Sequence, residues 1–140
     1  MPSFYQVASL FLWLAVIQSV CECNQECVWV EGQLLCNRNQ TWVINSTVTI
    51  FDRDGKSIFN VIDPDDKMGT TVVLDRDGKF RVEGCGNDRD WLPMILNKPE
   101  PYIVVHHYCV DRVKGTEMRL PEFNVFMPDV YRIHEIHLDE

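Results

Sequence analysis

The chain has 140 residues, the usual size of one domain with a core of its own. It carries 13 basic and 21 acidic residues, which gives a formal net charge of −8 at pH 7. Such a chain repels nucleic acid and is not attracted as a whole to anionic membranes. We therefore expect no nucleic-acid partner, and any binding of anions must come from a local basic patch.

An apolar run at the N-terminus covers residues 7–17 and reads VASLFLWLAVI. It is shorter than a helix needs to cross a bilayer, and residues where a peptidase could cut follow it. We expect residues 1–21 to be a cleaved signal peptide and residues 22–140 to form the mature domain. An uncleaved anchor helix is the alternative. No later segment is apolar enough to cross a membrane, so the sequence predicts a secreted protein without a transmembrane segment.

Cysteines and glycosylation sequons agree with an extracellular location. Behind a signal peptide, six cysteines favour disulfide bonds over a cytosolic metal site, with free buried thiols as the alternative. Two sequons, Asn39-Gln40-Thr41 and Asn45-Ser46-Thr47, make Asn39 and Asn45 candidate glycosylation sites. The cysteines are Cys21, Cys23, Cys27, Cys36, Cys85 and Cys109.

The first part of the mature chain contains two stretches with the two-residue period of β-strands, at residues 27–36 and 42–51. In the second stretch Asn45 falls on the outward face, where a glycan has access. Residues 52–69 form an expected loop, with a short edge strand at 57–62. The expected inward side chains of the two strands are Val28, Val30, Leu34, Cys36, Ile44, Val48 and Ile50.

The clearest local signal lies at residues 70–85, which read TTVVLDRDGKFRVEGC. A β-branched apolar run comes before Asp77-Gly78, and Phe80 and Val82 alternate with charged residues after it. An Asp-Gly pair between two such runs is typical of a tight hairpin turn, because glycine adopts a positive φ freely. The sequence therefore predicts a β-hairpin with Phe80 and Val82 buried.

The remaining pattern is again extended. Residues 86–101 form a second expected loop, and residues 102–109 form a central strand that points Ile103, Val105, His107 and Cys109 inward. Weaker strands are expected at 118–127, with Phe123, Val125 and Met127 in register, and at 131–138. Several short alternating strands without a long helical stripe predict an all-β sandwich of seven to eight strands with at most one short helix.

Five segments follow one another in the order seen in nematode transthyretin-like proteins. They are VEGQLLCN (30–37), DPDDKMG (63–69), LDRDGKFRVEG (74–84), PYIVVHHYC (101–109) and EFNVFMPDVY (122–131). The chain thus resembles the secreted nematode transthyretin-like family over nearly the whole mature domain. The resemblance implies a transthyretin-like, or prealbumin-like, β-sandwich of two antiparallel sheets.

The same resemblance carries a functional expectation. Some family members have been linked to recognition of phosphatidylserine exposed on apoptotic cells and to engulfment receptors. The resemblance implies a secreted, lipid-binding protein without enzymatic activity that takes part in phagocytosis and apoptotic cell clearance, and the sequons add the expectation of a glycoprotein. Its partners would be an anionic phospholipid head group and a cell-surface receptor. The alternative is an extracellular carrier of a small hydrophobic ligand or hormone.

An enzyme is the third candidate class. The fold also resembles that of the hydroxyisourate hydrolases, whose chains close with a Tyr-Arg-Gly-Ser-type tail that feeds the active site. This chain instead ends Ile136-His137-Leu138-Asp139-Glu140. We therefore carry over no hydrolase activity and expect no cofactor. The oligomeric state stays open.

Four cysteines are candidates for two disulfide bonds. Cys36 and Cys109 lie on the expected inward faces of two strong strands, and a bond between them would contribute about 2–4 kcal/mol. A second bond can join Cys85 to Cys27 or to Cys23. Because six cysteines allow many pairings, the connectivity stays open.

Two groups of residues are candidates for ligand binding. Arg76, Lys79, Arg81 and Arg89 lie near one another along the expected hairpin and its following loop, where they can hold a phosphate or carboxylate. Ordinary solvated charges are the alternative. Trp91 opens an apolar segment that can insert into a bilayer interface or a receptor groove, or else cover the open end of the sandwich.

Metal binding is a less favoured expectation. Two near-repeats, DRDGK at 52–56 and at 75–79, lack the spacing of an EF-hand, and two hairpin turns are the favoured explanation. Adjacent histidines His106 and His107 point to opposite faces of a strand, as do His134 and His137, so neither pair chelates easily. The weak calcium candidates are Asp52, Asp54, Asp63, Asp65 and Asp66.

Overall fold

The computed structural model describes residues 25–53, 65–87 and 98–140. Several expectations fall outside these residues: the signal peptide at 1–21, the edge strand at 57–62, and the residues Cys21, Cys23, Asp54, Asp63, Arg89 and Trp91. Among the described residues, no helix has the length and apolar character needed to cross a membrane.

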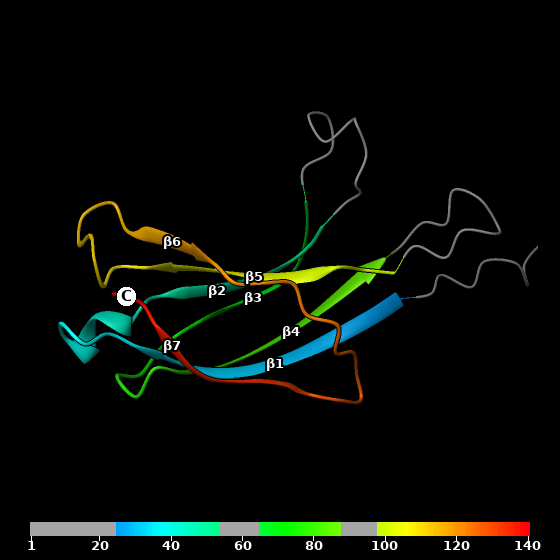
Figure 1. Cartoon of the computed structure of the whole chain (residues 1–140), viewed down its shortest axis with the longest axis horizontal. Coiled ribbons are helices and arrows are strands. Elements are labelled where there is room, and N and C mark those ends of the chain that lie inside the picture. The colour runs from blue at the N-terminus through cyan, green and yellow to red at the C-terminus, as the bar shows by residue number, and fades with distance from the viewer. Residues whose placement is uncertain (1–24, 54–64, 88–97) are drawn as a thin grey trace, which may run out of the picture.

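Within these described residues, seven strands form two sheets that pack face to face (Figure 1). One sheet has three strands in the order β4-β1-β7, and the other has four in the order β3-β2-β5-β6. The expected all-β sandwich of seven to eight strands with at most one short helix is confirmed for the described residues. The elements are β1 (Gln25–Leu35), η1 (Gln40–Val43), β2 (Thr47–Asp52), β3 (Asp66–Val72), β4 (Lys79–Asn87), β5 (Pro101–His107), β6 (Thr116–Arg119) and β7 (Tyr131–His137).

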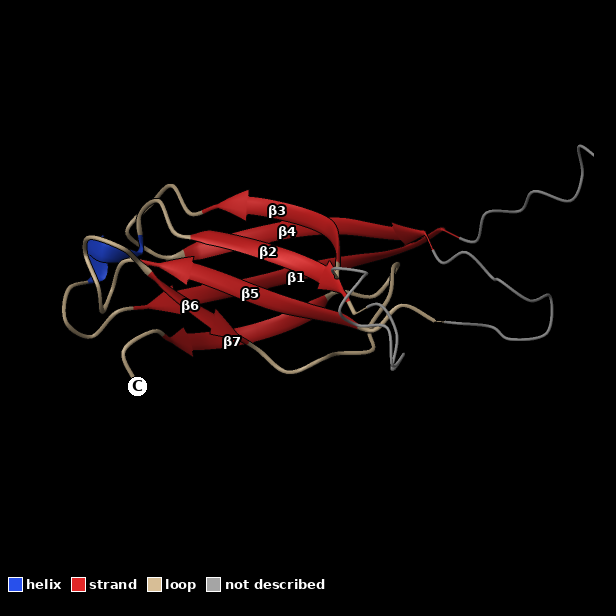
Figure 2. Ribbon diagram, turned by 90° about the horizontal axis from the view of Figure 1, so that it is seen from above, coloured by secondary structure: helices blue, strands red, loops and turns tan. Residues whose placement is uncertain are grey.

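The core lies between the two sheets, whose strands overlap when the molecule is seen from above (Figure 2). Every second residue of β1, β2 and β5 points into it, as the two-residue period predicts. Burial of these side chains removes apolar surface from water, which is the main favourable term for folding. The fully buried set includes Val28, Val30, Leu34, Val48, Ile50, Ile103 and Val105.

The predicted hairpin over residues 70–85 is wrong. β3 pairs with β2, and β4 pairs with β1, so the two strands belong to different sheets. The expected turn does exist, because the Gly78 N–H donates to the Asp75 carbonyl at 3.1 Å and Gly78 has φ of 72°. However, the Val73 N–H donates to the Ser46 carbonyl at 2.9 Å, and Val73 is buried between the layers. The chain therefore crosses from one sheet to the other.

Two glycines let β3 and β4 approach each other at the flank of the sandwich. A Cβ on Gly69 would collide with the carbonyl oxygen of Glu83, and a Cβ on Gly84 would lie 2.9 Å from the Cβ of Met68. Only residues without a side chain allow backbones to come so close. The edges of the two sheets therefore cover each other on this flank.

Two predicted strands are shorter than expected. The first part of the stretch 42–51 belongs to η1, where Asn39 caps the helix by accepting from the Thr41 N–H at 3.0 Å. Asn45 then takes a φ of 68°, which lies outside the extended region, and β2 begins only at Thr47. In the stretch 118–127 only the first two residues belong to β6, and the rest forms no strand although Phe123 is buried.

The ends of two further strands, and the direction in which one pair of strands runs, differ from the expectation. β3 begins at Asp66, inside the loop expected at 52–69, and β4 continues to Asn87. β7 runs parallel to β1, so that one of the pairs in the three-stranded sheet is not antiparallel. This pairing places Arg132 of β7 beside Glu31 of β1.

Candidate functional site

Two disulfide bonds hold the described part of the sandwich, so the expected presence of disulfide bonds is confirmed. Cys36 and Cys109 are joined across the two sheets, although they lie 73 positions apart in the sequence. Cys27 and Cys85 are joined within the three-stranded sheet, where they face each other in register. Both bonds fix β1, the central strand that carries much of the site described next.

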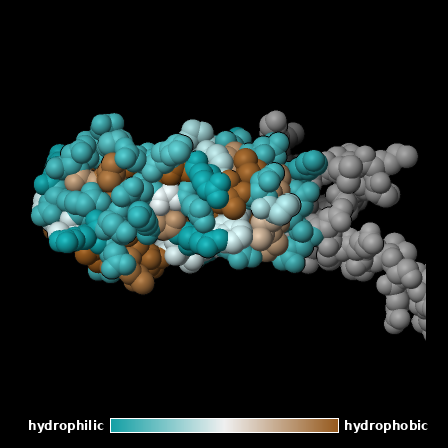
Figure 3. Space-filling view, turned by 90° about the horizontal axis from the view of Figure 1, so that it is seen from below, coloured by the Kyte–Doolittle hydropathy of each residue, from teal (hydrophilic) through white to brown (hydrophobic). Residues whose placement is uncertain are grey.

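The outer face of the three-stranded sheet gathers charged side chains. β1 contributes Trp29 and Glu31, β4 contributes Lys79 and Arg81, and β7 contributes Arg132. We call these five residues the charged face. Figure 3 views this side of the molecule and shows mainly hydrophilic side chains with smaller hydrophobic patches between them.

Glu31 lies at the centre of the charged face because its strand has a basic neighbour on either side. It is paired in register with Arg81 on β4 and with Arg132 on β7. One carboxylate oxygen lies 3.3 Å from the Arg81 Nε, and the other lies 3.5 Å from the Arg132 Nε. The three side chains are 33%, 56% and 70% exposed, so each pair contributes only about 0–1 kcal/mol. Both guanidinium groups remain accessible to a ligand.

The guanidinium group of Arg81 is also held by an aromatic ring. Its central carbon lies 3.6 Å from the centroid of the Trp29 ring. A cation over an indole at this distance is attracted by the ring quadrupole, and contributes about 0.5–1 kcal/mol at an exposed position. Trp29 and Glu31 therefore both contact the Arg81 guanidinium and favour its position along the sheet.

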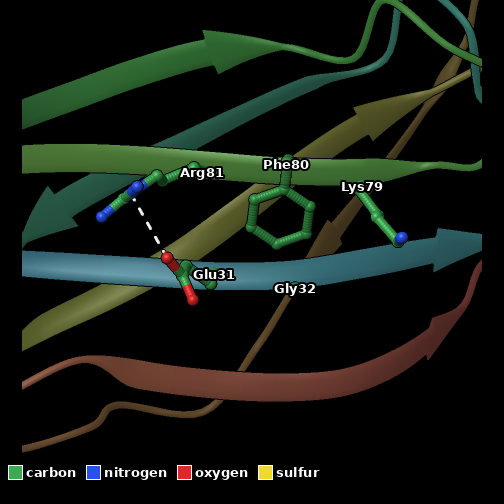
Figure 4. A pocket seen from close by; sticks show the side chains of 5 residues that line it. All are labelled: Glu31, Gly32, Lys79, Phe80 and Arg81. Carbon is green, nitrogen blue, oxygen red and sulfur yellow. Dashed lines mark ion pairs between the residues drawn. The ribbon is translucent and has the colours of Figure 1, made fainter.

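A shallow hollow of about 350 Å³ lies in the charged face. Its lining residues are Glu31, Gly32, Lys79, Phe80 and Arg81. In Figure 4 the side chains of Lys79 and Arg81 lie on opposite sides of the Phe80 ring, and Glu31 lies beside Arg81. A Cβ on Gly32 would lie 2.7 Å from the Phe80 Cζ, so the ring fills the space that a side chain would take.

The chemistry of the hollow is that of binding. It offers two cations and one carboxylate, while the Phe80 ring is buried and packs in the core. Arginine can bind a carboxylate or phosphate with two parallel N–H···O bonds, while lysine binds as a point charge. The arrangement can therefore hold an anionic group, and Glu31 adds a position for a positive one.

The structure brings together part of the basic group expected from the sequence. Lys79 and Arg81 line one hollow, whereas Arg76 is exposed on the turn between β3 and β4. The sequence reasoning missed Trp29, Glu31 and Arg132. The two-residue period puts Trp29 and Glu31 on the outward face of β1, but only the parallel pairing with β7 brings Arg132 to them.

The calcium expectation is not tested by this structure. Asp52 is buried, and its Oδ1 accepts from the Glu100 N–H at 2.8 Å. Asp65 accepts from the Tyr102 hydroxyl at 2.5 Å, and Asp66 is paired in register with Asp52. Burial, together with nearby carboxylates such as that of Asp66, raises the pKa of Asp52. Two of the candidate carboxylates are thus already bound by protein donors.

The other predicted positions lie away from the charged face. His106 and His107 point to opposite sides of β5, and His107 is buried while His106 is partly exposed. Asn39 and Asn45, the two candidate glycosylation positions, are both exposed near η1. Neither group contacts the hollow.

These features define an all-β, disulfide-linked sandwich whose accessible site is a charged sheet surface. A model of the transthyretin-like family matches residues 31–125, which is more than half of the chain. The chain belongs to the transthyretin-like family. Membership suggests a non-enzymatic binding or carrier role, since the family is generally without enzymatic activity.

Comparisons with individual proteins add little to the family match. No curated protein matches the chain. A 9R-lipoxygenase from Cyanothece PCC8801 is a similar solved structure, with 16% sequence identity and a TM-score of 0.40. The match covers 80% of this chain and 16% of the lipoxygenase chain.

Proposed function

We propose that this chain is a secreted recognition protein that binds the phosphatidylserine head group and links it to a cell-surface receptor. The proposal combines the family match with the charged face. The observation that carries it is the hollow, in which the cations of Lys79 and Arg81 lie together with the Glu31 carboxylate.

The charges of the hollow complement those of the head group. Phosphatidylserine presents a phosphate, a carboxylate and an ammonium group, which is two negative charges and one positive charge. The hollow presents Lys79, Arg81 and Glu31, which is two positive charges and one negative charge. Arg81 suits the planar carboxylate or the phosphate because its guanidinium forms two parallel hydrogen bonds. Since the hollow is open and shallow, a head group in a membrane surface can reach it.

The disulfide bonds support secretion, and the two faces of the sandwich provide the two surfaces that a bridging protein needs. Disulfide bonds between Cys27 and Cys85 and between Cys36 and Cys109 persist in oxidising compartments, which agrees with a signal peptide at 1–21. A bridging protein needs two separate surfaces. The four-stranded sheet faces the opposite side from the charged face (Figure 1), and we assign contact with the receptor to that side.

Co-sedimentation with vesicles tests the lipid part directly. The mature protein should pellet with phosphatidylcholine vesicles that contain phosphatidylserine and not with phosphatidylcholine alone. Replacing Lys79 and Arg81 together by alanine should abolish this binding, because both cations of the hollow are lost. The matched control replaces Lys67 and Lys114, two exposed lysines outside the charged face, and should bind like the wild type.

Several outcomes would contradict the proposal. Wild-type protein that ignores phosphatidylserine vesicles, with or without Ca²⁺, would remove the lipid ligand. Equal losses in the hollow variant and in the control variant would show that only overall charge matters. A small apolar ligand that remains bound in native mass spectrometry of the secreted protein would favour the carrier instead.

A further inference from the structure

We infer that Glu31 makes the charged face selective for ligands that carry an ammonium group beside their anions. This inference rests on the proposed function, because it concerns the ligand class of the same hollow. The preferred ligand of the charged face is then a phosphoserine-type head group. Purely anionic head groups, such as that of phosphatidylglycerol, are disfavoured although they carry the same net charge.

Without a ligand, the hollow already contains an ion pair. Glu31 is the one carboxylate among the lining residues, and it lies 3.3 Å from the Arg81 Nε. The cation that suits an incoming anion best is therefore already paired. An anion that takes Arg81 must compete with Glu31 for it, and it then lies next to a carboxylate of like charge.

An ammonium group on the ligand restores the ion pair that Glu31 loses when an anion takes Arg81. When a ligand anion takes Arg81, the Glu31 oxygen that faced Arg81 loses its partner. A ligand ammonium can replace that partner, so the hollow keeps its number of ion pairs. A purely anionic ligand leaves this oxygen unpaired and repelled. The difference between the two ligands is thus created by one side chain rather than by the net charge of the face.

Arg132 keeps Glu31 in place during this exchange. It lies 3.5 Å from the second carboxylate oxygen and belongs to the other neighbouring strand, outside the hollow lining. Glu31 therefore stays anchored when Arg81 turns to a ligand. Arg132 is a positioning residue, and its replacement by alanine should lower selectivity while binding to phosphatidylserine persists.

The test compares vesicles that contain equal fractions of phosphatidylserine or phosphatidylglycerol, two lipids of equal net charge. Wild-type protein should bind the phosphatidylserine vesicles about two- to fivefold more tightly, as expected for one exposed ion pair. Glu31→Gln should bring this ratio close to one, mainly by improving binding to phosphatidylglycerol. Soluble phosphoserine should compete with the vesicles more strongly than glycerol phosphate, and only for the wild type.

A matched control separates position from charge. Glu83→Gln removes the same charge from the same sheet, at a residue that does not line the hollow, and should leave the ratio unchanged. Thermal melting of each variant shows whether it is folded. If the wild type binds phosphatidylserine and Glu31→Gln keeps the wild-type ratio, the inference fails while the proposed function stands. If the wild type binds neither lipid, both fail.

Discussion

At the scale of single residues, His107 is the buried titratable group with the clearest consequence. Its side chain is 1% exposed, and its Nδ1 accepts from the Cys109 N–H at 3.3 Å. The Nε2 is buried and has no hydrogen-bond partner among the described residues. Burial, helped by the nearby charge of His106, lowers the pKa of His107, while Asp139 opposes the shift.

We predict that protonation of His107 destabilises the protein in mild acid. The imidazole has an ordinary pKa of 6.5, and folding lowers it, so the unfolded chain binds the proton more readily. The stability that depends on the neutral ring is therefore fully present above about pH 6.5 and is lost as the pH falls below that value. The melting temperature of the wild type should fall between about pH 7 and pH 5.5.

The variant His107→Gln provides the comparison, because it keeps a polar side chain of similar length without titration. It should be less stable than the wild type at neutral pH but lose less stability on acidification. Parallel pH profiles for the two proteins would show that another group, and not His107, causes the loss.

At the scale of elements, the sequence predicted strands better than it predicted their partners. The alternation of residues fixed the buried face of β1 and β5, because a two-residue period places alternate side chains on one side whatever the neighbour is. The turn at Gly78 was also located, since it needs a positive φ. Which sheet each flanking strand joins depends on contacts distant in sequence, and there the hairpin prediction failed.

The residues of the candidate site likewise include some that the local sequence places and one that only the complete fold brings to the others. Lys79 and Arg81 alternate on one strand, so their common face follows from the local sequence. Arg132 lies about 100 residues from Glu31 in the chain, and no local pattern links them. The parallel pairing of β7 with β1, which joins them, requires the complete fold.

The two disulfide bonds should differ in their contribution to stability. Their sequence separations of 73 and 58 residues give similar loop-closure entropies. Cys36 and Cys109 are buried in the core and join two sheets, whereas Cys27 and Cys85 join strands that already pair. We predict that replacing Cys36 and Cys109 by alanine costs about 2–5 kcal/mol, more than replacing Cys27 and Cys85.

Urea unfolding of both double variants measures this difference. The midpoint should be lower for the variant without the bond between the sheets, with similar slopes for both variants. Equal midpoints would mean that closing a long loop, rather than joining the two layers, sets the contribution of each bond.

At the scale of the whole molecule, the net charge and the charged face act in opposite directions. The chain carries a formal charge of −8, which an anionic membrane repels at long range. Lys79 and Arg81 attract a head group only at contact. Salt screens distant charges more than contacting ones, with a Debye length that falls from about 30 Å at 0.01 M to about 8 Å at 0.15 M.

We therefore predict that binding to phosphatidylserine vesicles changes little, or rises, when salt increases from about 0.01 M to about 0.15 M. Proteins that use a broad basic surface show the reverse. Co-sedimentation across this range measures the effect, and binding to vesicles without phosphatidylserine provides the baseline. A steep loss of binding with salt would indicate attraction spread over many basic residues.

The close approach of Gly69 and Gly84 also determines where other chains can attach. On that flank β3 and β4 shield each other, so their unpaired backbone groups are hard for a foreign strand to reach. The opposite flank ends in β6 and β7, the outermost strands of the two sheets. Growth of fibrils or exchange of strands between copies should therefore begin at β6 or β7, and larger side chains at the two glycines would open a second starting point.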